Sequence, residues 1–214
     1  MRLSKRKQNL AAIAALQAIS DWERLMEMLS ISIKSRKDVR PIYEILLQGY
    51  LFCGYPCAIE SFYSLNEVLL SKGLSLPANL PIPQMDVPKA LKRGKMFAAK
   101  INKDKFPKIY DKIRSLSPDL GYLMLVEGYG SILCRKGIDI QSRELAVVSS
   151  LTASGAIRQL NSHIRGALNV GCSKTQIRDA IMAGSPWIGK RKVLKALSIW
   201  SEITKLPISN LVKN

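Results

Sequence analysis

The chain contains one histidine, His163, in the stretch SRELAVVSSLTASGAIRQLNSHIRGALNVGCS at residues 142–173. An imidazole ordinarily has a pKa of about 6.5, so a histidine can donate and accept protons at neutral pH. A carboxylate bonded to one ring nitrogen would fix the tautomer and leave the other nitrogen for a substrate. His163 is therefore a candidate general acid or base. The alternative is a polar residue that simply lies on a helix face.

The residues around His163 predict two antiparallel helices joined at Gly155. Asp139 can cap a first helix that begins with IQSRELAVVSSLTAS, and a second helix, AIRQLNSHIRGALNV, would end at Gly171. The sequence SKTQ that follows has the form of a capping box and predicts another helix start. Glu144 would lie near the far end of the first helix and His163 about two turns into the second. Helices in such a pair pack about 8 to 10 Å apart, so these two side chains are expected to meet.

Helical periodicity runs through nearly the whole chain, so the expected fold class is all-α. The first third reads NLAAIAALQAI, DWERLMEMLSISI, PIYEILLQGYLF and AIESFYSLNEVLL. Residues 71–88, SKGLSLPANLPIPQMDVP, are rich in proline and predict an irregular connection. The basic, partly apolar start also has features of a secretory signal. It runs without a turn signal into a helical pattern, which favours a helix of the fold.

The chain also repeats itself under a shift of 135 positions, without a gap. Leu10, Leu16, Leu25, Gly49 and Gly54 align with Leu145, Leu151, Leu160, Gly184 and Gly189. Each half is therefore expected to be the same helical unit, with residues 10–68 superposing on residues 145–203. Glu144 aligns with Asn9 and His163 with Met28, so only the second copy can carry the candidate site.

Several spaced motifs together resemble the carboxymuconolactone decarboxylase family. They are SRELAVVSSL, the histidine segment HIRGALNVG, SKTQI and the glycine of PWIGK, in that order. The segment LSPDLGYLMLVEGYGSILCRKGIDIQSRE resembles the approach segment of two-repeat members, and EILLQGYLFCGYPCAIESF resembles the family's final helices. The resemblance implies an all-α fold of two similar helical repeats of the alkylhydroperoxidase D-like type, joined by the Pro-rich connection.

The resemblance also implies a cofactor-independent lyase that acts on a small anionic lactone or carboxylated metabolite. Such an enzyme removes CO2 and then protonates a carbon. Glu144 and His163 would be catalytic, with His163 as the proton donor and Glu144 as its orienting partner. Arg143 would bind a substrate carboxylate, and Tyr129 would be a further donor. Arg143 could equally form a surface ion pair and Tyr129 could belong to the core. The alternative function is a non-catalytic scaffold or binding protein that keeps the fold.

The redox branch of the family, the alkylhydroperoxidase D type, carries a glutamate, then a Cys-x-x-Cys pair, then a histidine. Here Glu144 and His163 are present, but Ala156 and Gln159 stand at the two cysteine positions. Without a thiolate nucleophile and a resolving thiol, peroxidase chemistry by that route is not expected.

The amino-acid composition limits which partners and which cellular compartment are expected. The four cysteines form no Cys-x-x-Cys pair and no Cys/His cluster, so no metal site and no cofactor are expected, and reduced thiols fit a cytoplasmic protein.

The net charge of +17 could attract nucleic acid, anionic lipid or an anionic substrate. The basic clusters have little aromatic interleaving and match no nucleic-acid motif, which favours a solvated basic surface and no nucleic-acid partner. No apolar run approaches the about 18 to 20 residues that cross a bilayer, so no membrane partner is expected.

The expected organisation has four parts. A degenerate N-terminal repeat spans residues 1–70, and a connecting segment with helices spans 71–135. A C-terminal repeat with the candidate site spans 136–206, and a tail spans 207–214. The family resemblance also implies a homo-oligomer, either a trimer or a hexamer.

Purified protein is expected to show no dithiol-dependent hydroperoxide turnover, because Ala156 and Gln159 replace the redox cysteines. Peroxide consumption with dithiothreitol as reductant measures this, with a Cys-x-x-Cys peroxidase as positive control. Turnover that disappears in Cys53→Ala or Cys57→Ala would overturn the prediction and place a redox site in the N-terminal half.

Overall fold

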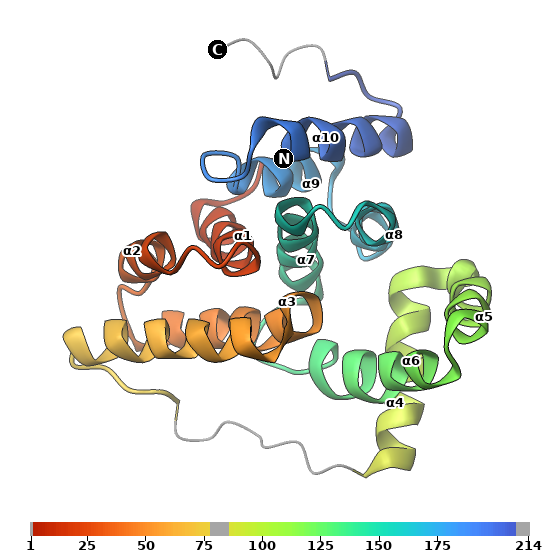
Figure 1. Cartoon of the computed structure of the whole chain (residues 1–214), viewed down its shortest axis with the longest axis horizontal. Coiled ribbons are helices and arrows are strands. Elements are labelled where there is room, and N and C mark those ends of the chain that lie inside the picture. Colours follow the sequence, from red (N-terminus) through yellow and green to blue (C-terminus); the bar gives the residue numbers. More distant parts are fainter. Residues whose placement is uncertain (1, 78–85, 209–214) are drawn as a thin grey trace.

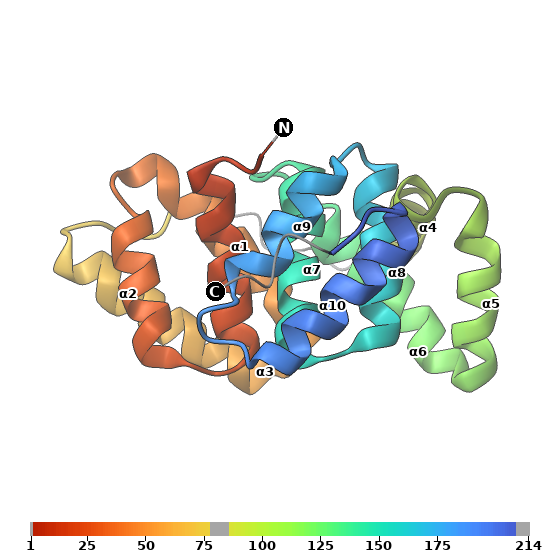
Figure 2. The ribbon, with the colours of Figure 1, turned by 90° about the horizontal axis from the view of Figure 1, so that it is seen from above.

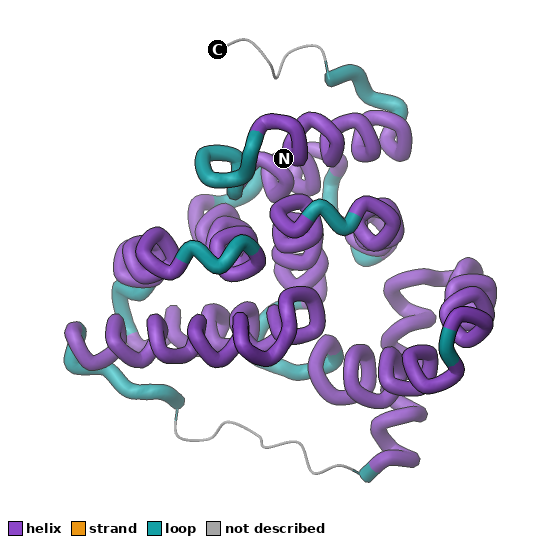
Figure 3. The backbone as a smooth tube through the Cα atoms, viewed as in Figure 1, coloured by secondary structure: helices purple, strands orange, loops and turns teal. Residues whose placement is uncertain are grey.

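The computed structural model describes residues 2–77 and 86–208, and helices make up most of this part (Figure 3). No strand occurs in these two ranges, so the all-α prediction is confirmed for them. The elements in chain order are α1 (Lys5–Ala18), α2 (Trp22–Ser32), α3 (Arg36–Ser71), α4 (Val87–Asn102), η1 (Lys103–Lys105), α5 (Phe106–Leu116), α6 (Pro118–Leu123), η2 (Met124–Leu133), α7 (Ile140–Ser154), α8 (Ile157–Asn169), α9 (Lys174–Ala183) and α10 (Lys190–Thr204). None of the described helices combines the length and the apolar character that crossing a membrane requires.

Helices α1 and α7 pack against each other in the middle of the fold (Figures 1 and 2). Helix α1 also contacts α2 and α3, while α7 also contacts α8, α9 and α10. Every residue of α7 from Ser142 to Ala153 is buried. A helix that is buried on all sides lies in the interior of a fold, and α7 carries both Arg143 and Glu144 into that interior.

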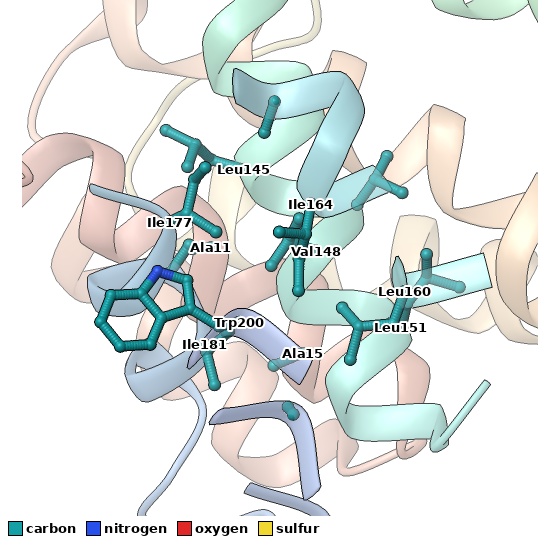
Figure 4. Close-up of a cluster of buried hydrophobic side chains, with 14 of the residues drawn as sticks. Ala11, Ala15, Leu145, Val148, Leu151, Leu160, Ile164, Ile177, Ile181 and Trp200 are labelled. Carbon is teal, nitrogen blue, oxygen red and sulfur yellow. The ribbon is translucent and has the colours of Figure 1, made fainter. Parts of the chain in front are cut away.

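A core of apolar side chains fills the space between these helices (Figure 4). It includes Ala11 and Ala15 of α1, Leu145, Val148 and Leu151 of α7, Leu160 and Ile164 of α8, Ile177 and Ile181 of α9, and Trp200 of α10. The indole nitrogen of Trp200 donates a hydrogen bond to the carbonyl oxygen of Lys174 at 2.8 Å, so its polar atom is satisfied. Small side chains on α1 let that helix approach α7 closely.

The local signals that surround the candidate site are confirmed. The side chain of Asp139 caps α7, and Gly155 ends it in the left-handed region at φ 81°. Gly171, after α8, has a φ of 93°. Ser173 and Gln176 form the predicted capping box at the start of α9.

The bounds of the helices follow the 135-residue shift. Helix α1 maps onto residues 140–153, and α7 spans 140–154; α2 maps onto residues 157–167, and α8 spans 157–169. Helix α3 is broken at Gly54, where φ is 87°, and that position maps onto Gly189, the residue just before α10. The superposition of the two halves itself stays a prediction.

Two predicted segments fall partly outside the described residues. Helix α3 ends at Ser71, residues 72–77 are not helical, and α4 begins at Val87 with a proline in its first turn. The rest of the Pro-rich connection, residues 78–85, lies outside the described ranges, as do residues 209–214 of the predicted tail.

Helices α4, α5 and α6 lie at one end of the molecule, with η2 leading from them to the centre (Figures 1 and 2). Element η2 is a π-helix, a wider turn that often occurs at functional sites. It packs closely on α4, because a Cβ atom at Gly94 would collide with the carbonyl oxygen of Leu125 and one at Gly130 with that of Ala90.

One buried carboxylate connects α3, α7 and the segment after η2. Glu44 accepts hydrogen bonds from Arg143 Nη2 at 2.8 Å and Arg135 Nε at 3.0 Å, and Arg40 Nη2 lies 2.9 Å from its other oxygen. We call these four residues the Glu44 cluster. Burial by itself raises the pKa of Glu44, but the bonds from Arg135 and Arg143 outweigh it, so the pKa of this carboxyl is lowered.

Glu44→Gln is expected to lower the free energy of unfolding by about 3 to 5 kcal/mol, because it leaves buried guanidinium groups without a counter-charge. Since the folded pKa of Glu44 is lowered, its contribution is present above the ordinary carboxyl pKa of about 4.3 and is lost as the pH falls below it. The difference between wild type and variant should therefore shrink in acid.

Urea unfolding at pH 7 and at acidic pH measures this difference. Glu67→Gln, which removes the same charge from an exposed position of α3, is the matched control and should change stability by about 0.5 kcal/mol or less. A Glu44→Gln variant as stable as this control would show that the cluster does not hold the helices together.

Candidate active site around Glu144 and His163

The structure brings Glu144 and His163 together across the α7–α8 hairpin. Nδ1 of His163 lies 3.0 Å from Oε2 of Glu144, and both side chains are buried, with 8% and 1% of their surface exposed. Because a carboxylate only accepts, we assign the ring hydrogen to Nδ1. Nε2 is then the nitrogen that can exchange a proton with a bound molecule.

A glycine on α8 makes room for the carboxylate. A Cβ atom at Gly166 would lie 2.9 Å from Oε2 of Glu144 and 2.8 Å from Cγ2 of Ile101. Gly166 lies three residues after His163, on the same face of α8. Sequence reasoning did not select Gly166, although this spacing is the signal that could have found it.

The negative charge of Glu144 contributes to raised pKa values of two neighbouring groups. Burial and then the Glu144 carboxylate raise the pKa of Tyr129 to about 12. Burial and Glu144 likewise raise the pKa of the Cys172 thiol to about 12. Both groups therefore stay protonated at neutral pH, which leaves Tyr129 able to donate a hydrogen bond.

His163 lines a pocket of about 470 Å³ whose walls come from α3, α5, α6, η2 and α8. The aliphatic, methionine and phenylalanine members of its lining are Leu51, Phe52, Ile113, Leu120, Leu123, Met124 and Leu133. The ring of Phe52 meets the imidazole of His163 edge to face, with 5.8 Å between centroids. Its described lining includes no lysine and no arginine, and its charged member is Glu127. A mostly apolar pocket with a few polar groups is the usual form of a small-molecule site.

Tyr129 belongs to the core and also lines the pocket, while its role as a donor stays a prediction. Its side chain is buried and belongs to a core cluster, and it also lines the pocket. Its hydroxyl accepts a hydrogen bond from Nδ2 of Asn102 at 3.3 Å. The phenol is thus fixed in place next to the space that His163 faces.

Arg143 lies elsewhere. Its side chain is 1% exposed, Nη1 donates to Gln48 at 3.1 Å, and Nη2 is bound by Glu44. It is not among the residues that line the pocket. Because a carboxylate of the protein already binds this guanidinium, its placement does not support the predicted role in substrate binding.

Several pocket residues were not selected from the sequence. Tyr50, Phe52 and Tyr55 come from α3, and Glu127 comes from η2. No sequence signal links the α3 residues to His163, because the contact spans more than a hundred positions. Glu127 stands two residues before Tyr129 in the same EGYG segment, and that neighbourhood could have suggested it.

The positions of the redox cysteines hold other groups. Gln159 lines the pocket and Ala156 is the residue before α8. The Sγ atoms of Cys53 and Cys57 lie 2.6 Å apart as free thiols, and neither residue lines the pocket. The hydrogen bond between them raises the pKa of Cys53 and lowers that of Cys57. Among the described side chains, no group of three or more His, Cys, Asp or Glu could hold a metal.

Comparison with known proteins gives a family match that includes this hairpin. Residues 121–202 match the model of the carboxymuconolactone decarboxylase family. Over 86 residues, 38% of this chain, the sequence is 33% identical to Peroxisomal protein 2 of Saccharomyces cerevisiae. Over 89 residues, 41% of the chain, it is 32% identical to an uncharacterized 15.0 kDa protein from the nqo9-nqo10 intergenic region of Paracoccus denitrificans.

A third relative is the nitrosuccinic acid decarboxylase npaB of Metarhizium robertsii, 27% identical over 71 residues, which are 33% of this chain. The matched stretches span 30%, 66% and 50% of the three relatives, in the order given. The family match contains η2, α7 and α8 with Glu144 and His163, whereas the α3 wall of the pocket lies outside it. Over residues 121–202, less than half of its length, this all-α chain is therefore similar to the carboxymuconolactone decarboxylase family.

Proposed function

We propose that this protein is a cofactor-independent acid/base lyase that decarboxylates a small carboxylated metabolite at His163. The observation that carries the proposal is the Glu144–His163 hydrogen bond of 3.0 Å, with His163 on the wall of an apolar pocket. The family match and the decarboxylase name of one relative support the reaction class.

The reaction would run in two steps with a balanced proton count. The bond between the carboxylate and its neighbouring carbon breaks, CO2 leaves, and the electron pair spreads into an adjacent electron-withdrawing group such as an unsaturated lactone or a nitro group. Protonated His163 then delivers a proton from Nε2 to the carbon, and solvent returns a proton to the ring. Glu144 would hold the ring through Nδ1 and stabilise its positive charge during the cycle.

The pocket lining suits this sequence of charges. The substrate starts with a localised carboxylate and passes through a delocalised carbanion, so a lining of leucine, methionine and phenylalanine side chains disfavours the starting charge more than the dispersed one. Gln159 lies one helical turn before His163 on the same face of α8, and its amide can orient the substrate. Tyr129 can donate to the oxygen on which charge develops.

The alternative is a non-catalytic scaffold or binding protein with the same fold. In either case we propose a homo-oligomer. Tyr55, Leu120 and Leu123 line the pocket yet are 64%, 54% and 48% exposed, and a second copy could cover such an apolar rim. Light scattering of the purified chain reads the oligomeric state.

His163→Asn is expected to return decarboxylation to the uncatalysed rate. The asparagine amide can still donate to Glu144 from the position of Nδ1, but the nitrogen that exchanges the proton is lost. The assay measures CO2 release from a panel of 2-nitro acids and carboxylated unsaturated lactones, with deuterium incorporation at the product carbon in D2O.

The same donor to Glu144 should keep the free energy of unfolding within about 1 kcal/mol of wild type. Equal turnover by wild type and His163→Asn would contradict the acid/base assignment. A panel on which the wild-type protein is inactive throughout would favour the scaffold alternative.

Gly166→Ala tests whether the position of Glu144 matters for the reaction. The added methyl group would displace Oε2 or Ile101, so kcat should fall about 10- to 100-fold with little change in KM. Overpacking should also lower the free energy of unfolding by about 1 to 3 kcal/mol. Gly189→Ala is the matched control, because a Cβ atom there meets nothing within 4 Å. An unchanged kcat in Gly166→Ala would show that the carboxylate need not be held in this place.

A further inference from the structure

The pocket contains a second polar group that proton transfer at His163 does not use. Oε1 of Glu127 accepts a hydrogen bond from the hydroxyl of Tyr50 at 2.9 Å and one from the hydroxyl of Tyr55 at 3.4 Å. The two tyrosine rings stack on each other, with 4.9 Å between centroids and an interplanar angle of 27°. All three residues line the pocket. We call them the Glu127 cluster.

Two irregularities of the helices build this cluster. Tyr50 and Tyr55 are five residues apart, which in a regular helix would separate them by about 140° around the axis. The break at Gly54 lies between them, and with φ 87° and ψ 167° it turns Tyr55 back onto Tyr50. Glu127 comes from the π-helix η2. Left-handed backbone of this kind suits glycine, so the break is specified by the sequence.

The hydrogen bonds leave part of the carboxylate unused. Both tyrosines donate to Oε1, so Oε2 remains as an acceptor. No ion pair of Glu127 occurs among the described residues, and the described lining of the pocket includes no lysine or arginine. Burial, together with the hydrogen bond to Glu127, raises the pKa of the Tyr50 phenol, so Tyr50 stays a donor to the carboxylate. A ligand can therefore supply the missing donor.

We infer that the Glu127 cluster is a specificity site that binds an N–H or O–H donor on an otherwise apolar ligand and excludes a second carboxylate. An ammonium or hydroxyl group satisfies Oε2, whereas an anion at this place meets a like charge with no cation in the lining to offset it. This inference rests on the proposed function only in that the ligand occupies the same pocket. It narrows the substrate class to monocarboxylates that carry a hydroxyl or amino group.

Binding of four unreactive probes tests the site separately from catalysis. The probes are 3-phenylpropionates whose para substituent is aminomethyl (the amine), hydroxymethyl (the alcohol), methoxymethyl (the ether) or carboxylate (the dicarboxylate), so they share one carboxylate and a ring and differ in the second polar group. NMR titration of the full chain measures each dissociation constant at pH 7. The amine and the alcohol should bind about tenfold more tightly than the dicarboxylate, as one hydrogen bond to a charged group allows, and the ether should have an affinity between these values.

Glu127→Gln should weaken binding of the amine about tenfold and bring the dicarboxylate to an affinity close to that of the amine. If only the amine loses affinity, the site recognises the positive charge of the ligand. If the amine and the alcohol both lose affinity, the site recognises a hydrogen-bond donor through the acceptor oxygen of Glu127. Both results support the site. Glu67→Gln, which removes a charge from an exposed part of the same protein, should leave the order of affinities unchanged.

The order of probe affinities in the wild-type protein can by itself support or contradict the inference, so the test does not require that a variant folds. Equal or tighter binding of the dicarboxylate to the wild-type protein overturns the inference, and so does an unchanged order of affinities in folded Glu127→Gln. His163→Asn should keep the order of probe affinities. The binding test can therefore support the specificity site even if the protein shows no decarboxylation, and it can contradict the site even if decarboxylation is observed.

Discussion

The buried carboxylate of Glu44 and the three arginines around it are the contact on which the pocket depends. This cluster joins α3, which supplies the tyrosine and phenylalanine wall, to α7, which supplies Glu144, and to Arg135, two residues after the end of η2. A buried ion pair stabilises a fold only in good geometry, because its desolvation is costly. The same cost makes the geometry selective, since a small slide of α3 along α7 would leave buried charges without partners. The Glu44 cluster, which lies outside the pocket, thus fixes the distance between the pocket walls.

Helix α7 serves two purposes with two consecutive residues. Successive side chains on a helix differ by about 100°, so Arg143 and Glu144 necessarily face different neighbours. Arg143 turns toward α3 and enters the Glu44 cluster, whereas Glu144 turns toward α8 and meets His163. The sequence motif SRE does not reveal this division, because the partner of Arg143 lies 99 residues earlier in the chain. Only the packing of α3 on α7 shows which of the two charged residues remains for chemistry.

What could be predicted from the sequence was local. Caps, left-handed glycines and apolar spacing lie within a few residues of the features they specify, so the α7–α8 hairpin and the facing of Glu144 and His163 followed from them. The π-helix η2 and the stacking of Tyr50 on Tyr55 depend on contacts between distant segments. The break in α3 at Gly54 was not predicted from the sequence, and the effect of that break on the direction of Tyr55 needs the folded chain. Local sequence patterns therefore predict the α7–α8 half of the candidate site, but they do not predict the wall that α3 and η2 supply.

The charge of the chain acts at a different range from the chemistry of the pocket. A net charge of +17 draws anions toward the protein, but salt screens that field within about 8 Å under physiological conditions. Inside the pocket the described lining offers Glu127 and His163 and no lysine or arginine, so local groups decide which molecule stays. The basic surface can raise the rate at which a carboxylated molecule arrives, since steering depends on the summed field. Affinity is then set by the apolar wall, by Glu127 and by the His163 end, so attraction of anions and selection among them are separate properties of this fold.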